Sequence, residues 1–238
     1  AVSEWNWGPI SQYRGASGLS FGAFAARQDW DALWRFTYSD SGDWWRSGDE
    51  DGFPSFACSY DPMMIASERA VTCLFLRGDM PPLESRLALE VTAEANLAPD
   101  GKRVREVVPV WHCAAHDLRV ATVLQGVSAD GWQRVGLADW GATNEPPIAV
   151  NGDGAYVSDR QNHSFMVVTP RTSGGFAFPG RAMTCGALTF CAEGFPATVW
   201  ASALIGDTIE TATRILVTHL TDTQRHGSVF VDDTEKII

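Results

Sequence analysis

The sequence predicts a β-rich α/β protein in which a parallel βα unit is followed by an all-β unit. Two β-like runs, at residues 1–7 and 31–39, flank an Ala/Phe-rich helical stretch at residues 17–28. This strand–helix–strand order is the repeat of a parallel α/β architecture. From Pro147 onward, short β-like runs alternate with turns, at a spacing typical of an antiparallel β-sandwich or a partly closed barrel.

The N-terminal unit contains a second helix with clear start and stop signals. Asp61 suits the N-cap, Pro62 suits the first helical position, and Gly78 lies just past the expected end. Residues 40–60, which precede this helix, form a long polar and aromatic loop, and loops of that length are usually functional or disordered. The residues that can share one buried stripe of the helix are Ile65, Val71, Leu74 and Phe75.

The middle of the chain predicts one strand and one helix. Apolar and charged residues alternate over residues 86–95, which fits a half-buried strand, and residues 109–124 fit a helix with one apolar side. The glycine-containing runs at 152–154 and 173–175 fit tight turns. The expected strands of the all-β unit are residues 148–150, 155–158, 164–169, 182–191, 197–205, 214–220 and 228–231.

Length, charge and cysteine content limit the class of protein. The 238 residues allow one large domain or two small ones, and we place the boundary near residues 79–86, which gives domains 1–80 and 81–238. The net charge of −11 argues against nucleic acid or an anionic membrane as partner, whereas a neutral glycan is compatible. No apolar run approaches the roughly 18 residues of a membrane-spanning helix. Five cysteines are too scattered for a disulfide framework, although Cys185 and Cys191 could face each other across a hairpin.

Several short motifs resemble one group of enzymes. In the N-terminal unit they are Ser3-Glu4-Trp5-Asn6-Trp7, residues 27–33, Asp61-Pro62 and Arg77-Gly78-Asp79, and in the β-rich unit they are residues 167–171 and 214–219. This set is similar to bacterial β-galactosidase-like glycoside hydrolases of clan A, related to family forty-two. One departure is Tyr13-Arg14, which is followed by Gly15 where the group would have an acidic residue.

The resemblance implies both a fold and an activity. Residues 1–80 would be the last two βα units of a (β/α)8 barrel, and residues 81–238 a β-sandwich-like accessory domain. The implied reaction is retaining hydrolysis of a β-linked, galactose-type glycoside with Glu4 as nucleophile. A closed barrel takes about 250 residues, so we expect this chain to be part of a longer protein or complex that supplies the remainder of the barrel in cis or in trans. The acid/base of the clan lies on an earlier strand, so the chain alone is expected to be inactive.

Aromatic side chains near Glu4 are candidates for stacking on sugar rings, because a ring combines apolar area with a polar handle. Six of the ten tryptophans fall within the first 45 residues. Core packing is the alternative role for these rings, especially for Trp30 and Trp34, and a turn is the alternative role for Asn6. The candidate substrate-binding residues are Trp5, Asn6, Trp34, Tyr38, Trp44 and Trp45.

Two other functions remain open from the sequence. The chain could be a non-catalytic carbohydrate-binding module, in which Glu4 is an ordinary solvated carboxylate, or the β-rich unit could form a homo-oligomer. His112 and His116 have the i, i+4 spacing of zinc ligands, but they lack a third ligand and the glutamate of the protease motif. Residues 48–52 lack the alternating ligands of a calcium loop. We therefore expect no metal and no cofactor.

Overall fold

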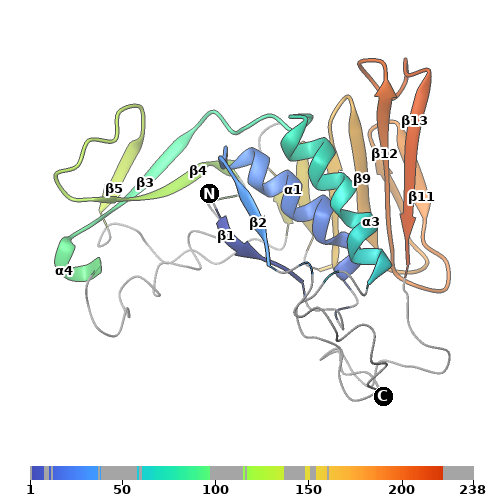
Figure 1. Cartoon of the computed structure of the whole chain (residues 1–238), viewed down its shortest axis with the longest axis horizontal. Helices are drawn as coiled ribbons and strands as arrows, with labels where there is room; N and C mark the ends of the chain where they lie inside the picture. Colours follow the sequence, from blue (N-terminus) through green and yellow to red (C-terminus); the bar gives the residue numbers. More distant parts are fainter. Residues whose placement is uncertain are drawn as a thin grey trace.

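The computed structural model describes residues 2–7, 11, 13–36, 38, 58, 61–96, 115, 117–136, 148–150, 154–159 and 161–221. Within these residues the protein has a β-rich α/β fold. Helices α1 (Ser17–Arg27) and α3 (Pro62–Val71) lie beside sheets of parallel and of antiparallel strands (Figure 1). The predicted mixture of α/β and β-rich parts is confirmed at this level.

The N-terminal part is a βαβα arrangement around two parallel strands. β1 (Val2–Trp5) pairs in parallel with β2 (Leu33–Arg35), and η1 (Arg14–Ala16) and α1 connect the two. α3 follows β2 in the chain and continues as a π-helical turn, η3 (Thr72–Leu76). β2 is shorter than the run predicted at residues 31–39.

Both helices begin and end close to the sequence signals that predicted them. α1 covers nearly all of residues 17–28. At α3, Asp61 Oδ1 accepts a hydrogen bond from the Met63 N–H at 2.9 Å, and Pro62 occupies the first helical position. Gly78 has a φ of 77° just past η3, a conformation that glycine adopts without a Cβ clash. On the predicted stripe, Val71 and Leu74 are buried, Phe75 is half-buried and Ile65 is exposed.

Two glycines of α1 allow α3 to pack at close range. A Cβ on Gly18 would lie 1.9 Å from the backbone oxygen of Ser67, and a Cβ on Gly22 would lie 2.9 Å from the Cα of Val71. The Ser67 Oγ accepts a hydrogen bond from the Gly18 N–H at 2.7 Å and donates one to the Gly15 carbonyl at 3.0 Å. The two helices are therefore joined through their backbones as well as through apolar side chains.

A three-stranded parallel sheet, with strand order β4–β3–β5, lies at one side of the molecule (Figure 1). The helix predicted at residues 109–124 is wrong over 119–124, where Val120 and Thr122 have branched side chains that favour a strand paired with β3. The strand predicted at 86–95 ends early, and its last residues begin the short helix α4 (Ala93–Asn96). The strands are β3 (Arg86–Val91), β4 (Arg119–Leu124) and β5 (Gln133–Gly136).

The C-terminal part is a six-stranded antiparallel sheet with strand order β13–β12–β9–β8–β7–β6. A separate hairpin pairs β10 (Ala182–Cys185) with β11 (Leu188–Cys191), so the strand predicted at 182–191 is two strands. Cys191 lies opposite Ala182, and both Cys185 and Cys191 are free thiols. The strand predicted at 228–231 lies outside the described residues. The six strands are β6 (Ile148–Val150), β7 (Tyr156–Asp159), β8 (Ser164–Val168), β9 (Thr172–Ala177), β12 (Ala197–Ile205) and β13 (Arg214–Leu220).

The buried strand β9 corrects the turn predicted at residues 173–175. Gly174 pairs with Trp200 of β12, and a Cβ on Gly174 would lie 2.3 Å from the Trp200 Cβ. A Cβ on Gly175 would lie 2.4 Å from the sulfur of Met183 in the β10–β11 hairpin. The glycines therefore give space to neighbours on both faces of the sheet, and they do not mark a turn.

The six-stranded sheet is covered by α1 and α3 on one face and by the β10–β11 hairpin on the other. Leu19 and Ala23 of α1, Leu74 of η3 and Trp200 of β12 are fully buried in one cluster between helices and sheet. This cluster contains residues from both sides of the boundary predicted near residues 79–86. The largest sheet and the two helices thus share one buried core.

Two polar joints fix the sheets to the helices. Gln28, just past α1, donates to the carbonyls of Ala115 at 2.8 Å and Leu118 at 2.9 Å, and it accepts a hydrogen bond from the Val120 N–H at 2.9 Å. At the other joint, the Arg77 guanidinium donates to Ser202 Oγ at 2.5 Å. The hydrogen bond between Arg77 and Asp79 raises the pKa of this guanidinium, so it stays charged.

Candidate functional site

Glu4 is exposed near the end of β1. The adjacent Trp5 packs against Phe21 of α1. On β2, Arg35 contacts Trp5. The preceding Trp34 is 63% exposed and borders a hollow that Trp5 and Glu68 also line. Glu4 and Trp34 are thus both exposed on the β1–β2 pair, whose exposed surface we call the open face.

β1 is irregular at the position of Glu4. Val2 pairs with Leu33 and Trp5 pairs with Arg35, so three steps along β1 match two steps along β2. An irregularity of this kind changes the direction of side chains along a strand, and β-bulges, one form of it, recur next to active sites. The irregular stretch contains Glu4.

Trp5 belongs to the packed layer beneath this face. Its ring is 7% exposed and stacks on Phe21 of α1, with ring centroids 4.6 Å apart. The Arg35 guanidinium lies 4.4 Å from the centre of the Trp5 ring, and its Nη1 lies 2.9 Å from Glu68 Oε1. Burial raises the pKa of the Glu68 carboxyl, and the charge of Arg35 partly opposes this. Trp5 supports the open face, and core packing accounts for its position.

The remaining predicted residues divide between exposed and locally bonded positions. Tyr38, which follows β2, is 68% exposed. The Asn6 side-chain oxygen accepts a hydrogen bond from the Trp7 N–H at 2.8 Å, as a turn residue does. Trp30 packs edge-on against Phe21 and Phe24, with centroid distances of 5.8 and 5.6 Å. Trp44 and Trp45 lie outside the described residues.

The chemistry available on the open face is that of one solvated carboxylate beside exposed aromatic rings. A carboxylate can attack an electrophilic carbon or accept hydrogen bonds from hydroxyls, and the rings can stack on a sugar. In the part of the chain that the structure describes, no three side chains of His, Cys, Asp or Glu come close enough together to hold a metal ion. His112, His116 and residues 48–52 lie outside that part.

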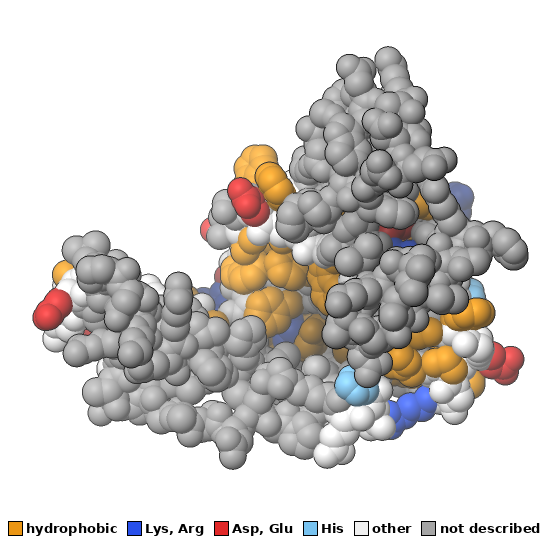
Figure 2. Space-filling view, turned by 90° about the horizontal axis from the view of Figure 1, so that it is seen from below, with side chains coloured by type: hydrophobic (Ala, Val, Ile, Leu, Met, Phe, Trp, Pro, Cys, Tyr) orange, Lys and Arg blue, Asp and Glu red, His pale blue; other side chains and the backbone are white. Residues whose placement is uncertain are grey.

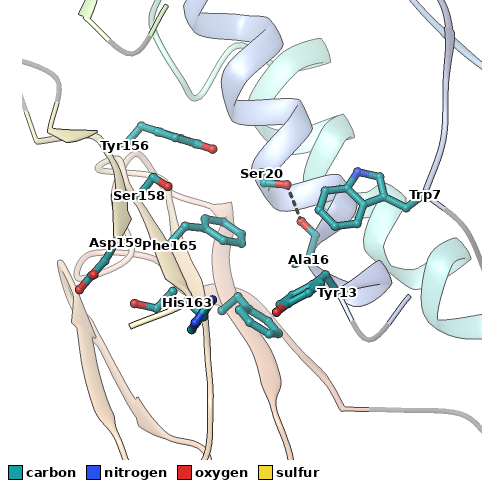
Figure 3. Close-up of a pocket in the computed structure, with 11 residues that line it drawn as sticks. Trp7, Tyr13, Ala16, Ser20, Tyr156, Ser158, Asp159, His163 and Phe165 are labelled. Carbon is teal, nitrogen blue, oxygen red and sulfur yellow. Dashed lines mark hydrogen bonds between the residues drawn. The ribbon is translucent and has the colours of Figure 1, made fainter. Parts of the chain in front are cut away.

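A second feature, which sequence reasoning did not identify, is a pocket of about 490 Å³ between α1 and the six-stranded sheet (Figure 3). We call it the aromatic pocket. Its signal in the sequence was the alternation within the predicted strands 155–158 and 164–169, which places Tyr156, Ser158 and Phe165 on one face of the sheet. Its lining residues are Trp7, Tyr13, Ala16, Ser20, Tyr156, Ser158, Asp159, His163, Ser164, Phe165 and Phe176.

Comparisons with known proteins identify no relative. No family model, no curated protein and no solved structure matches the chain. None of the helices in the described ranges is long and apolar enough to span a membrane.

Proposed function

We propose that Glu4 is the catalytic nucleophile of a retaining β-glycosidase, and that β1, α1, β2 and α3 form the last two βα units of its (β/α)8 barrel. The observation that carries this proposal is the exposed Glu4 carboxylate near the end of a parallel strand that packs against a helix. In barrels of this type the catalytic residues lie at the carboxyl ends of the strands, on the side of the βα loops.

The surroundings of Glu4 support a sugar as substrate. Trp34 and Tyr38 are exposed next to the strand ends and offer ring faces to a pyranose. Figure 2 shows hydrophobic side chains exposed near the middle of the face seen from below. The galactose-type, β-linked substrate is the one that the motif resemblance implies.

The open edge of β2 supports a larger parallel sheet. Among the described residues β2 pairs only with β1, and two parallel strands do not form a stable sheet by themselves. A hollow of about 390 Å³ lies between β2 and α3, and its lining includes Leu33 of β2 and Leu76 of η3, which is 72% exposed. We propose that the remaining barrel strands, in cis or in trans, occupy this edge.

In the proposed first step, one bond forms and one bond breaks at the anomeric carbon of the sugar. A Glu4 carboxylate oxygen attacks the anomeric carbon, the bond to the leaving-group oxygen breaks, and that oxygen keeps the electron pair and takes a proton from the acid/base. A water molecule then cleaves the glycosyl ester, giving its proton to the same acid/base. We assign the acid/base to the part of the barrel that this chain does not supply.

Within this proposal the six-stranded sheet is the accessory domain of the enzyme. Its helix-facing side is occupied by the core cluster around Trp200, and the outer strand β13 leaves Val217 62% exposed. The proposed role of this domain is to brace the barrel through Arg77 and to mediate homo-oligomer contacts.

Trapping the glycosyl ester tests the role of Glu4. Native mass spectrometry first establishes whether the 25.9 kDa chain occurs with a partner that completes the sheet. That complete protein is then treated with a 2-deoxy-2-fluoro-β-galactoside that carries a dinitrophenyl leaving group. This leaving group departs without an acid, and the fluorine slows hydrolysis of the ester. We expect release of one dinitrophenolate and one glycosyl adduct on the peptide that contains Glu4.

Two matched variants interpret the result. Glu4→Gln should abolish the adduct, whereas Asp31→Asn, which changes an exposed carboxylate before β2, should leave the adduct unchanged. An adduct on another residue, or an unlabelled protein that still binds galactosides, would favour the alternative of a non-catalytic carbohydrate-binding module.

A further inference from the structure

We propose that the aromatic pocket binds one sugar ring of a neutral glycoside, at a site separate from the Glu4 carboxylate. This site does not depend on Glu4 being a nucleophile. It is carried by the chemistry of the pocket lining, by its size and by its position between α1 and the six-stranded sheet (Figure 3).

One wall of the pocket is a row of nearly parallel rings on the helix-facing side of the sheet. The rings of Tyr156 and Phe165 lie 6.3 Å apart with 22° between their planes, and those of Phe165 and Phe176 lie 6.5 Å apart with 10° between them. Strand register produces this row, because Phe165 pairs directly with Phe176 on β9. Such a row makes this wall apolar, and the C–H face of a pyranose packs on aromatic rings.

The opposite wall comes from the segment between β1 and α1. Tyr13 meets Phe176 edge-on at 5.3 Å, and the Trp7 ring lies beside Ala16 and Ser20 at the start of α1 (Figure 3). A ligand in the pocket would therefore contact rings from two walls, and its edges would face the hydroxyl groups of the lining.

The polar groups of the lining suit a neutral ligand that carries hydroxyls. Ser158 and Ser164 are half-buried on β7 and β8, and the Trp7 indole N–H is a donor. Apart from the exposed His163, no described lining residue can carry a positive charge, and the net charge of the chain is −11, so the lining disfavours an anionic ligand. The lining thus combines apolar rings with neutral hydrogen-bonding groups, which is the pattern of sugar recognition.

The ionised group of the lining is already engaged at the rim. Asp159 also borders a hollow on the opposite side of β7 and β8, near Arg181. The Asn162 backbone N–H and its side-chain amide donate to the Asp159 carboxylate at 3.0 and 2.6 Å, and these bonds lower the pKa of that carboxyl. The carboxylate is therefore held in the β7–β8 turn and does not set the charge of the ligand.

The size and position of the pocket complete the argument. Its volume of about 490 Å³ falls within the range of about 300–1,000 Å³ found for small-molecule sites. Glu4, Trp34 and Tyr38 are not among the lining residues of the pocket, so the pocket is separate from the Glu4 carboxylate. Two sugar rings could therefore occupy the protein at once.

Saturation-transfer NMR of the full chain with methyl β-galactoside and methyl β-glucoside tests the proposal. Trp7→Ala removes a ring, and Ser158→Leu fills the pocket from β7 without removing a ring. Each should raise the Kd for the bound glycoside about ten-fold or more, which is the scale of one lost aromatic contact. Trp132→Ala, at a half-buried tryptophan beside Arg86 on the distant sheet, and Trp34→Ala should leave this Kd unchanged.

Three outcomes would overturn the pocket as a sugar site. Unchanged binding in Trp7→Ala and Ser158→Leu, with wild-type thermal melting, would exclude the pocket. Loss of binding in Trp34→Ala alone would move the sugar to the Glu4 face. Binding of phenol without binding of either glycoside would give the pocket a different ligand class. None of these results affects the trapping of the ester on Glu4, so the two proposals fail separately.

Discussion

The Nε of Arg14 lies 2.5 Å from Oδ2 of Asp61, and both side chains are almost fully buried. This ion pair ties the entrance of α1 to the N-terminus of α3. Asp61 uses its other oxygen to cap α3 at Met63, and Arg14 also donates to the Ser11 carbonyl at 3.0 Å. The sequence has Gly15, and no acidic residue, directly after Arg14. The acidic partner of Arg14 is instead Asp61, which lies 47 residues further along the chain.

Breaking this pair should strongly destabilise the fold. Arg14→Met leaves the Asp61 carboxylate buried without its counter-charge, which costs about 3–5 kcal/mol of unfolding free energy. Arg134→Met is the matched control, because the Arg134–Glu90 pair is about one-third exposed and contributes about 0–1 kcal/mol. Urea denaturation of the two variants measures the difference. Equal shifts of the urea midpoint would mean that the buried pair contributes no more to stability than the exposed pair.

The close contact of α1 with α3 gives a second prediction. Gly18→Ala places a methyl group against the Ser67 carbonyl, and we expect a loss of about 1–3 kcal/mol from overpacking, although alanine is the better helix former. Ser20→Ala, on the same helix but half-buried, should change stability by less than about 0.5 kcal/mol. Thermal unfolding followed by circular dichroism compares them. A Gly18→Ala variant as stable as the wild type would show that the helices can separate at no cost.

Tyr156 predicts a loss of stability at alkaline pH. Burial raises the pKa of its hydroxyl to about 12, above the value of about 10 in the unfolded chain. Because the folded pKa is the higher one, this contribution is fully present below pH 10 and is lost as the pH rises to about 12. At pH 11 the wild type should have lost about 1.4 kcal/mol more than Tyr156→Phe, relative to pH 9. Denaturant titrations of both proteins at both pH values test this. Identical losses of unfolding free energy in the two proteins would mean that the Tyr156 hydroxyl is exposed to solvent.

The described cysteines should differ sharply in reactivity. Cys191 is exposed, whereas Cys58, Cys73 and Cys185 are buried, and burial raises the pKa of the Cys185 thiol to about 12. The thiolate is the reactive form, so brief treatment of the native protein with iodoacetamide at pH 8 should modify Cys191 first among these four. Peptide mass mapping gives the order, and Cys191→Ser removes the fast phase. Equal modification of Cys185 would contradict the packing of the β10–β11 hairpin.

Trp34 should influence the trapping reaction through the sugar ring. In the complete protein, Trp34→Ala should slow formation of the Glu4 adduct about ten-fold, the effect expected for one lost ring contact. Its thermal midpoint should stay unchanged, since most of the ring is exposed. Trp132→Ala is the control and should label at the wild-type rate. A normal rate for Trp34→Ala would remove this ring from the substrate site.

Sequence alone was reliable where the signal was local. The N-cap at Asp61, the proline after it and the helix end at Gly78 depend on neighbouring backbone groups, and the structure has all three. The strand predicted at residues 164–169 is also present, as β8. The nucleophile role of Glu4 came from the motif resemblance and stays a prediction.

Other parts depended on contacts that the sequence does not display. Residues 119–124 form a strand because β3 supplies the hydrogen bonds on one side, and apolar periodicity alone also fitted a helix. Trp5 and Trp34 are both strand tryptophans, and only the pairing of β1 with β2 and the position of α1 decide that Trp5 is buried and Trp34 exposed.

The sequence by itself determined the helix ends, most strands of the β-rich part and the residue types available for chemistry. Only the tertiary structure decided that Gly174 and Gly175 lie in a central strand, since the space they leave is filled by Trp200 and Met183 from distant elements. It also decided where the aromatic pocket forms, because strand register and the packing of α1 bring Tyr13 into contact with Phe176, more than 160 residues away in the sequence. Local preferences act through adjacent backbone groups, whereas a binding surface forms only where distant segments pack together.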